Sequence, residues 1–249
     1  MGGRLVLINS VLSSLPVYML SFFEIPRKVL EKIDFLRSRF YWQSEDEKKK
    51  YRLAKWGVLC QPKEVGGIGI KNIDSQNKCL LVKWLFKLAN EEGMWQQILK
   101  RKYFRNKTIG EVQVKPGDSH FWSGLMKIKE LFLSHGRFVT NRGINVRFWE
   151  DKWLGDFSLE HRFPSLCYIT RRKHATVANV LSSTPLNVSF RRGLQGDTLR
   201  QWNSLVALVL DVSLNLAKDH FRWNLTQNGE YTVQSLYSVM ICSGQGRQD

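Results

Sequence analysis

Apolar residues in the first ninety positions recur with the spacing of α-helices. They follow helical intervals from Leu5 to Leu15, and the apolar character continues beyond Pro16 as far as Phe23. Because a proline can end one helix or open the next, this run predicts two short buried helices joined near Pro16. An amphipathic helix is predicted from Arg27 onward. Its apolar seam would consist of Val29, Leu30, Ile33, Leu36 and Phe40.

Residues 73–90 carry the clearest helical pattern of the chain. Leucines and Trp84 form a wide apolar face, and lysines occupy the opposite side. A further helix is predicted near Trp95, running into the basic sequence Lys100-Arg101-Lys102-Tyr103. Earlier in the chain, Gly66, Gly67 and Gly69 flank a short apolar segment without the spacing of a nucleotide-binding loop. They predict a tight turn with close backbone packing.

The pattern changes after residue 105. Residues 121–133 predict a helix, and 138–148 alternate around the turn sequence 141–143, which favours a β-hairpin. Residues 202–216 predict another helix, 221–233 predict two short strands around 228–229, and a last helix starts near 234. The predicted fold class is therefore α+β, with a helix-rich bundle over residues 1–105 and a smaller mixed region with short β-hairpins over 106–249.

The charge is the first indication of a partner. Thirty-eight Lys and Arg residues oppose 22 Asp and Glu residues, giving a formal net charge of +16, of which the first 180 residues hold +15. A basic excess on a folded body favours a polyanion, because phosphate contacts release counterions. A folded protein that merely has a high isoelectric point is the open alternative, and an acidic membrane surface is less favoured.

Candidate phosphate contacts are the basic residues of the predicted helices and of the 100–102 cluster. They are Arg27, Lys28, Lys32, Arg37, Arg39, Lys83, Lys87, Lys100, Arg101 and Lys102. Tyr103 adds a ring of the kind on which bases stack. The nine tryptophans are interpreted mainly as core residues, with Trp42 and Trp153 as the better stacking candidates.

No catalytic residue, metal ligand or cofactor is predicted. The sequence has no Asp-Asp pair, no Gly-x-Ser-x-Gly turn and no phosphate-binding loop. The acidic clusters at 45–47, 91–92 and 150–151 are interpreted as solvated or helix-capping charge. His161, Cys167 and His174 lie near one another, but their spacing matches no zinc-ligand pattern.

An intracellular location, in the nucleus or cytoplasm, is expected. Polar residues and Pro16 interrupt the N-terminal apolar run, so it predicts neither a signal peptide nor a membrane span. The four cysteines lie far apart, which favours reduced thiols. The basic run 48–52 could serve as a nuclear localisation signal, although a solvated loop is the favoured interpretation.

Four sequence blocks resemble plant LINE-type (non-LTR) retrotransposon reverse transcriptases. They are GGRLVLINSVLSSLPVYMLSFFEIP at 2–26, LAKWGVLCQPKEVGGIGIKNIDSQNKCLLVKWLFKL at 53–88, NRGINVRFWEDKWLGD at 141–156 and FRWNLTQNGEYTVQSLY at 221–237. The blocks occur in the family's order, and the resemblance extends over nearly all of residues 2–240.

The resemblance implies that residues 1–105 form a thumb-like region and residues 106–249 a connecting region before a zinc-binding segment. The family's catalytic aspartates lie in an upstream palm, as two-metal nucleotidyl transfer requires. No Asp-Asp turn occurs in this sequence, so no polymerase activity is expected from the chain alone. Without a palm, the Leu5–Phe23 side is expected to expose an apolar patch through which the chain could self-associate.

Three hypotheses for function follow. The chain grips RNA or an RNA–DNA hybrid by its backbone, or it is a non-catalytic scaffold or interaction protein, or it is a non-functional remnant of a decayed element. Salt-sensitive binding distinguishes the first hypothesis from the second, and a broad thermal transition would indicate the third.

Overall fold

The computed structural model of the chain describes residues 2–42, 52–105 and 107–243. These residues form two compact units. The first unit contains the described residues of 1–84, 114–128 and 231–249, and the second contains those of 85–113 and 129–230. The predicted division at residue 105 concerns regions of a family, which this grouping does not test, so it stays a prediction.

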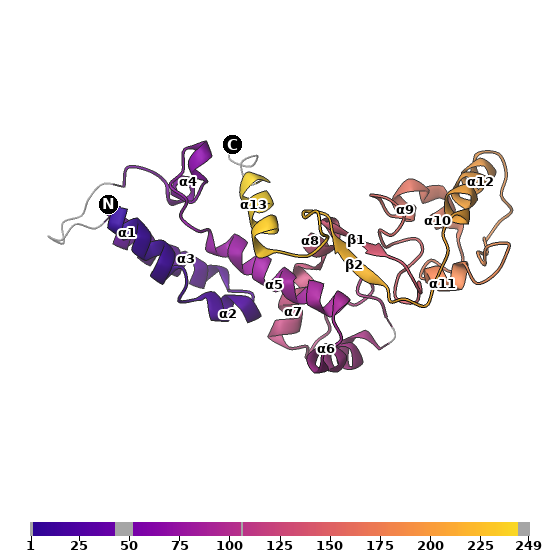
Figure 1. Cartoon of the computed structure of the whole chain (residues 1–249), viewed down its shortest axis with the longest axis horizontal. Coiled ribbons are helices and arrows are strands. Elements are labelled where there is room, and N and C mark those ends of the chain that lie inside the picture. Colours follow the sequence, from indigo (N-terminus) through magenta and orange to yellow (C-terminus); the bar gives the residue numbers. More distant parts are fainter. Residues whose placement is uncertain (1, 43–51, 106, 244–249) are drawn as a thin grey trace. The chain divides into compact units, whose positions relative to one another are not determined.

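The first unit begins with the predicted helices on either side of Pro16 (Figure 1). They are α1 (Gly2–Leu7), which continues into the π-helix η1 (Ile8–Leu12), and α2 (Val17–Phe22). Asn77 fixes the end of α2, since its side-chain amide donates to Leu20 O at 2.6 Å and to Phe23 O at 2.8 Å. These bonds satisfy carbonyl groups that a helix end leaves without partners.

Much of the N-terminal apolar run is exposed rather than buried. Seven large apolar side chains between residues 5 and 23 are 40–73% exposed. They are Val6, Leu7, Val11, Leu15, Tyr18, Met19 and Phe23. Self-association through this surface stays a prediction.

Helix α3 (Arg27–Trp42) forms where the amphipathic pattern predicts it, but it buries a different stripe. Val29, Leu36 and Phe40 are 36–52% exposed, whereas Arg37, Ser38, Tyr41 and Trp42 are buried. Tyr41 and Trp42 pack with Ile8, Leu59, Cys60 and Ile70 in one cluster. The predicted seam is therefore wrong at these three exposed positions, whereas Leu30 and Ile33 are half-buried, because the most buried side of α3 carries residues 37, 38 and 41.

The glycine turn forms as predicted. Helix α4 (Trp56–Leu59) and the 3₁₀-helix η2 (Lys63–Val65) lead into Gly66, whose φ of 88° favours glycine. At Gly67 a Cβ would lie 1.9 Å from Gln61 O, closer than any side chain allows. The turn returns the chain so that Ile70 reaches the core of the first unit.

Helix α5 (Ile73–Asn90) has the predicted bounds and runs from the first unit into the second. Within the first unit, the Trp84 ring packs against Phe22 in a tilted arrangement and against Phe121 of α7 (His120–Lys127) edge to face, at ring-centroid distances of 5.2 and 5.9 Å. The last helix of the first unit, α13 (Val233–Ser243), follows Tyr231, whose hydroxyl donates to Cys79 O at 2.6 Å. The apolar face of α5 is thus covered from two directions.

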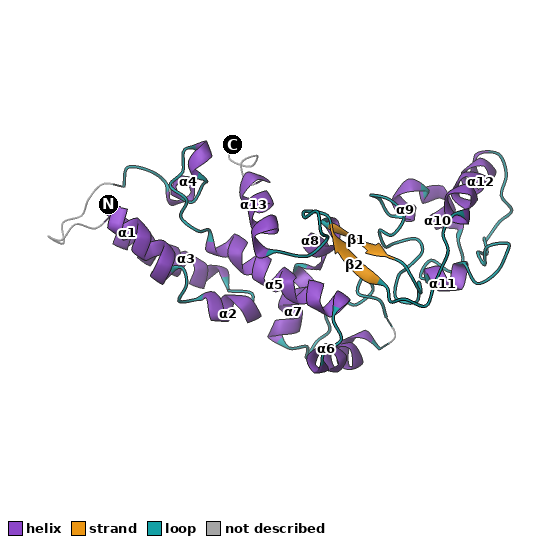
Figure 2. Ribbon diagram, in the orientation of Figure 1, coloured by secondary structure: helices purple, strands orange, loops and turns teal. Residues whose placement is uncertain are grey.

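The second unit contains the remaining elements (Figure 2). They are α6 (Met94–Leu99), the π-helix η3 (Lys100–Phe104), α8 (Lys129–Ser134), β1 (Gly136–Val139), α9 (Leu159–Arg162), α10 (Pro164–Ile169), α11 (Val177–Val180), α12 (Asp197–Leu210) and β2 (His220–Trp223). Helices make up about 52% of the residues and strands about 5%, which confirms the helix-rich α+β class.

The two strands belong to one sheet, and neither predicted hairpin forms. In the described chain β1 pairs antiparallel with the distant β2, with Gly136 opposite Trp223. Around the expected first turn, the amides of Asn141, Gly143 and Asn145 donate to the carboxylate of Asp219 instead of a neighbouring strand. The turn near 228–229 does close, through Trp223 N to Gly229 O at 2.8 Å, but the chain then enters α13.

Aromatic rings join the sheet to α8 inside the second unit. Phe221 lies with its ring centroid 4.1 Å from that of Phe132 and 5.0 Å from that of Phe138. All three side chains are buried. This packing fixes β2 and the segment before it, which lines the cavity described below. Across the described residues, every helix is too short or too polar to span a bilayer.

Candidate nucleic-acid interface

A cavity of about 840 Å³ lies within the second unit. We call it the basic cavity. Its walls come from the end of α5, the α6–η3 helix, residues 107–111, and the chain leading into β2. Phe104 and Phe138 contribute rings to the lining. The volume falls in the range of small-molecule and nucleotide pockets, about 300–1,000 Å³.

Five formally cationic residues line the basic cavity. They are Lys100, Arg101, Arg105, Lys107 and Lys218. Three of them, Lys100, Arg101 and Arg105, belong to the π-helix η3 that continues α6 and to the residue that ends it, and Lys107 follows two residues later. Single-turn π-helices are frequent at functional sites. The backbone of Arg105 has a φ of 43°, a left-handed conformation that is uncommon for residues other than glycine. Residues in this conformation occur more often than usual at binding sites.

The three acidic residues of the lining are engaged within the protein. Glu92 forms an ion pair with Lys218. Glu111 accepts a hydrogen bond from Thr108 N at 2.8 Å. Asp219 accepts three backbone amides at 2.8, 2.8 and 3.3 Å. Their carboxylates are therefore occupied by internal partners.

The cations are not matched in the same way. Arg101, Arg105 and Lys107 are exposed, and among the described residues their side chains make no ion pair or hydrogen bond. Burial, with the nearby charge of Lys218, lowers the pKa of Lys100, although Glu92 opposes this effect. A lining whose acids are occupied and whose cations are left over favours binding of an anion.

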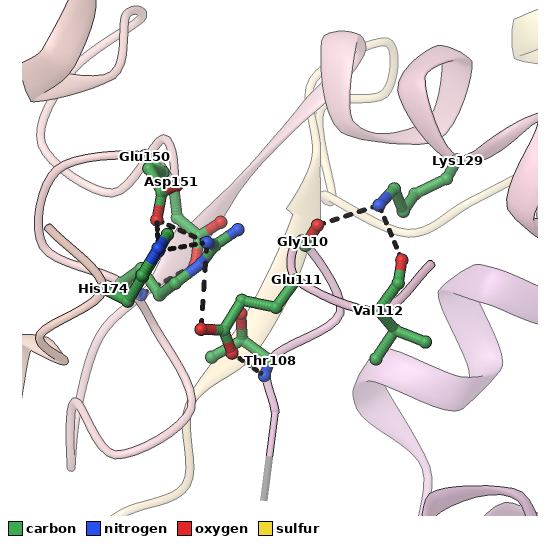
Figure 3. A network of polar contacts seen from close by, with 9 residues as sticks. Thr108, Gly110, Glu111, Val112, Lys129, Glu150, Asp151 and His174 are labelled. Carbon is green, nitrogen blue, oxygen red and sulfur yellow. Dashed lines mark hydrogen bonds and ion pairs between the residues drawn. The ribbon is translucent and has the colours of Figure 1, made fainter. Parts of the chain in front are cut away.

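A polar network that includes Glu111, Glu150, Asp151 and His174 (Figure 3) supports one wall of the basic cavity. The Arg147 guanidinium forms an ion pair with Glu150 and lies 4.0 Å from Glu111 Oε1. His174, whose Nδ1 is 3.1 Å from Glu150 Oε2, joins the network at its exposed end. Glu111 and His174 both line the cavity, so the network holds two wall residues in place.

Lys129 fixes the loop that carries Glu111, and Asp151 holds the backbone of Arg147. Asp151 accepts the amide of Arg147 at 2.7 Å, and burial raises its pKa to about 6 against the opposing effects of Arg147. Lys129, whose pKa burial lowers, donates to Gly110 O at 2.8 Å and Val112 O at 2.9 Å. A buried cation is tolerated where it is fully hydrogen-bonded.

One of the described acidic clusters, the 150–151 pair, differs from its predicted role, whereas Glu91 and Glu92 are solvated as predicted, with side chains 49% and 61% exposed. Asp151 is 5% exposed, so the 150–151 pair is a structural network and not solvated charge. In the 91–92 pair, Glu91 accepts from Gln96 at 3.0 Å, and Glu92 pairs with Lys218. The 45–47 cluster and residues 48–51 of the basic run lie outside the described residues.

The structure divides the ten predicted phosphate contacts between the two units. The first unit holds Arg27, Lys28, Lys32, Arg37, Arg39 and Lys83, and the second holds Lys87, Lys100, Arg101 and Lys102. Only Lys100 and Arg101 line the basic cavity. Lys102 lies 5.0 Å from the Tyr103 ring centroid, and Lys87 is 3.8 Å from Glu91.

The cavity beside α3 does not gather the basic residues of that helix. Its lining has four acidic residues, Glu24, Glu31, Asp34 and Asp74, against three basic ones, Arg27, Arg52 and Lys78. Arg27 pairs with Glu31 at 3.0 Å. Lys28 and Lys32 are exposed on the helix. The α3 surface is therefore a weaker anion site than the basic cavity.

Arg37 departs from the expectation of a phosphate contact. Its side chain is 2% exposed. The guanidinium donates to Ser13 Oγ at 2.9 Å and Lys71 O at 2.7 Å, and it pairs with Asp34 at 2.8 Å. With these partners Arg37 joins three segments of the first unit and is withdrawn from solvent.

The two tryptophans favoured for stacking are also core residues. Trp42 and Trp153 are 9% and 7% exposed, and Trp153 Nε1 donates to Phe148 O at 2.8 Å. Sequence reasoning missed Arg105, Lys107, Lys218 and His220 as lining residues. The first two continue the basic run 100–102, which was a usable signal, but nothing in the sequence connects Lys218 or His220 to that run.

The described residues contain no group of three or more His, Cys, Asp or Glu side chains placed to hold a metal ion. His161, Cys167 and His174 therefore do not assemble into a ligand set. The four cysteines are free thiols, as expected for a reduced chain, and three are buried. Burial raises the pKa of Cys60 and Cys79 to about 12, so these thiols are inert core groups.

The chain is similar to two proteins of Arabidopsis thaliana. The "Putative ribonuclease H protein At1g65750" is 30% identical over 251 residues, covering 96% of this chain and 39% of the relative. The "Uncharacterized mitochondrial protein AtMg00310" is 30% identical over 146 residues, covering 57% of this chain and 94% of the relative. Relatives of these two kinds are typical of reading frames derived from retrotransposons.

The chain spans about two fifths of the length of the larger relative. No protein-family model matches the chain. No solved structure matches it either.

Proposed function

The chain belongs to the same protein family as the mitochondrial protein AtMg00310 of Arabidopsis thaliana, and from that premise we propose that it is a retrotransposon-derived protein that binds the phosphate backbone of nucleic acid in its basic cavity. We further infer that it corresponds to the thumb and connecting region of a LINE-type reverse transcriptase. The four sequence blocks in family order support this second inference.

The observation that carries the proposal is the imbalance of charge in the basic cavity. Arg101, Arg105 and Lys107 surround a cavity whose three carboxylates are already occupied by internal donors. An RNA strand or an RNA–DNA hybrid would supply phosphates to these cations and release the counterions that accompany the free backbone. The proposed partner is therefore the backbone, with no base sequence specified.

No chemical step is assigned to the chain. The name of the larger relative refers to ribonuclease H, and this chain covers 39% of that protein. The observations on the described residues favour binding, and none of them favours a polymerase or nuclease reaction. Binding by itself would serve to hold a template or hybrid.

The test is a salt titration of binding to a fluorescent RNA hairpin and to an RNA–DNA hybrid. A cavity variant, R101Q/R105Q/K107Q, is compared with a control variant, K55Q/K63Q/K115Q, which removes three exposed lysines that do not line the cavity. Three lost duplex contacts should flatten the slope of log affinity against log salt by about 2.7. The control should keep the wild-type slope.

Equal losses in both variants would mean diffuse attraction to a basic protein and would overturn the cavity as the site. A folded wild-type chain that binds neither ligand would favour the scaffold hypothesis. A chain whose circular dichroism and thermal transition show no folded state would favour a remnant, and the family relationship would then describe ancestry alone.

A further inference from the structure

A second cationic surface lies in the second unit, apart from the residues that the sequence pattern singled out. Between Glu160 and Asp197 the chain contains no acidic residue, yet it carries six Lys and Arg residues. They are Arg162, Arg171, Arg172, Lys173, Arg191 and Arg192. The stretch therefore supplies no carboxylate of its own to balance these cations.

Part of this stretch forms a hollow, which we call the turn cavity. It has a volume of about 340 Å³. Arg171, Arg172, Lys173 and His174 line it together with Asn179 and Asn187, and no carboxylate belongs to the lining. The basic cavity balances five cations against three acids, so the turn cavity is the more one-sided of the two.

The backbone of the turn is held by its own hydrogen bonds. An antiparallel bridge joins Thr170 to Phe190, with Arg171 N donating to Ser189 O at 2.9 Å. A second bridge joins Thr176 to Arg147 on the other side of the turn. The four basic residues therefore project from a short loop fixed at both ends, which reduces the entropic cost of ordering them around a ligand.

Two of these side chains are not engaged by other described residues of the protein. Within the described chain, Arg172 and Lys173 make no side-chain hydrogen bond or ion pair, whereas Arg171 Nε donates to Phe190 O at 3.1 Å. The side-chain amide of Asn187 donates to Asn179 O at 3.2 Å, which ties the two asparagines of the lining together. Cations and amides in this arrangement match the oxygens of a phosphate group.

His174 connects this hollow to the basic cavity, because it lines both. Its Nδ1 is directed to Glu150, and its side chain is 68% exposed. A strand that places one phosphate near Lys107 or Arg105 can continue past His174 to the turn. A free phosphate ion would fill only one of the two hollows.

We propose that the turn Arg171–His174 is a second phosphate-binding site, which receives the backbone of the single nucleic-acid strand that occupies the basic cavity. This inference rests on the proposed function, since it extends the same binding surface. It assigns to this surface the residues Arg172 and Lys173. It also names a single strand as the ligand.

The experiment uses the full chain and a fluorescent single-stranded RNA of twelve nucleotides. A turn variant, R172Q/K173Q, is compared with R191Q/R192Q, which removes the same charge from the same acid-free stretch but from residues that do not line the turn cavity. Both variants keep Arg171 and its bond to Phe190 O. The turn variant should flatten the salt slope by about 1.4, as expected for two single-strand contacts. The control should keep the wild-type slope.

Equal flattening in the two variants, or none in the turn variant, would overturn the proposal. The cavity variant R101Q/R105Q/K107Q is measured in parallel, so that the two sites can fail separately. If only the turn variant flattened the salt slope, the basic cavity would be excluded as a binding site and the turn would be retained as one. In a last arm, inorganic phosphate replaces chloride at equal ionic strength. Displacement of RNA from the wild type but not from the turn variant would show that phosphate and the RNA backbone compete for the turn. Phosphate that binds the wild type but not the turn variant and leaves RNA binding unchanged would identify a free-phosphate site and refute a strand.

Thermal unfolding of each variant separates lost binding from lost folding. The turn backbone bonds do not involve the substituted side chains, so both variants should unfold at the wild-type temperature. If the turn variant were unfolded, R172K/K173R would replace it. This variant keeps both positive charges and changes only the geometry of their hydrogen-bond donors. An unchanged salt slope with a weaker affinity for RNA would support the site. An unchanged affinity would count against it.

Discussion

Replacing Arg37 by methionine separates a structural arginine from a phosphate contact. Three hydrogen bonds hold the guanidinium, to Asp34 Oδ1, Ser13 Oγ and Lys71 O at 2.7–2.9 Å. The guanidinium carbon also lies 5.4 Å from the Trp56 ring centroid. Methionine fills a similar volume but leaves these acceptors without a donor, so the first unit should lose stability.

The magnitude follows from the groups involved. A hydrogen bond from a charged donor contributes about 1.5 to 3 kcal/mol. Burying a methionine side chain recovers about 2 kcal/mol, and removing the arginine also relieves the desolvation of its charge. The free energy of unfolding should therefore fall by about 2 to 4 kcal/mol, because Ser13 Oγ and Lys71 O lose their charged donor, whereas Asp34, whose side chain is 38% exposed, can be hydrated.

The assay is urea denaturation followed by circular dichroism, with K28M as the matched control. Lys28 is exposed on the same helix, so its loss removes an equal charge and should change stability by less than about 0.5 kcal/mol. Under conditions where R37M is folded, its salt slope for the RNA–DNA hybrid should equal that of the wild type. A stable R37M protein with a slope flattened by about 0.9 would refute the reasoning and restore Arg37 as a phosphate contact.

Two further predictions concern the network behind the basic cavity. Burial raises the pKa of Asp151 to about 6, so the folded chain binds this proton more tightly than the unfolded chain. The resulting stabilisation is fully present below about pH 4 and is lost as the pH rises through 6. The free energy of unfolding should fall by about 3 kcal/mol across this range. D151N should lack this loss, and urea denaturation between pH 4.5 and 8 would contradict the assignment if the stability difference between the two proteins did not change with pH. At Gly110 an added Cβ would lie 2.4 Å from Arg147 Nη2 and 3.0 Å from Asp151 Oδ1, so G110A should destabilise the chain by about 1 to 3 kcal/mol. G193A, which meets nothing within 4 Å, is its control, and equal melting temperatures for the two variants would show that the loop moves freely.

Local patterns predicted the elements whose neighbours are close in sequence. The apolar face of α5 is formed mainly by Leu80, Leu81, Trp84, Leu85 and Leu88, and the structure gives the predicted bounds of the helix. The glycine turn needed only the backbone freedom of Gly66 and Gly67, which is a local property. Both predictions depend on residues within one element.

The failures share a different cause. Arg37 is buried through contacts with residues 24 and 34 positions away, and helical spacing carries no information about them. The first predicted hairpin does not form, because the backbone amides around its turn donate to the carboxylate of Asp219 instead. Asp219 lies 74–78 residues along the chain from these amides. A turn sequence such as 141–143 favours a reversal of the chain, but the partner of the strand before it is chosen by tertiary packing.

The same reasoning explains why net charge alone misplaced part of the binding surface. A count of cations treats Arg37 and Arg101 alike, although one is occupied by three internal acceptors and the other is exposed beside a cavity. A phosphate site is determined by the cationic side chains that make no ion pair with an internal carboxylate and no hydrogen bond to an internal carbonyl. In the basic cavity the carboxylates accept hydrogen bonds from backbone amides or form an ion pair with Lys218. The lining of the turn cavity contains no carboxylate. The distribution of carboxylates, more than that of lysines and arginines, therefore locates the surface on which a nucleic-acid strand would lie.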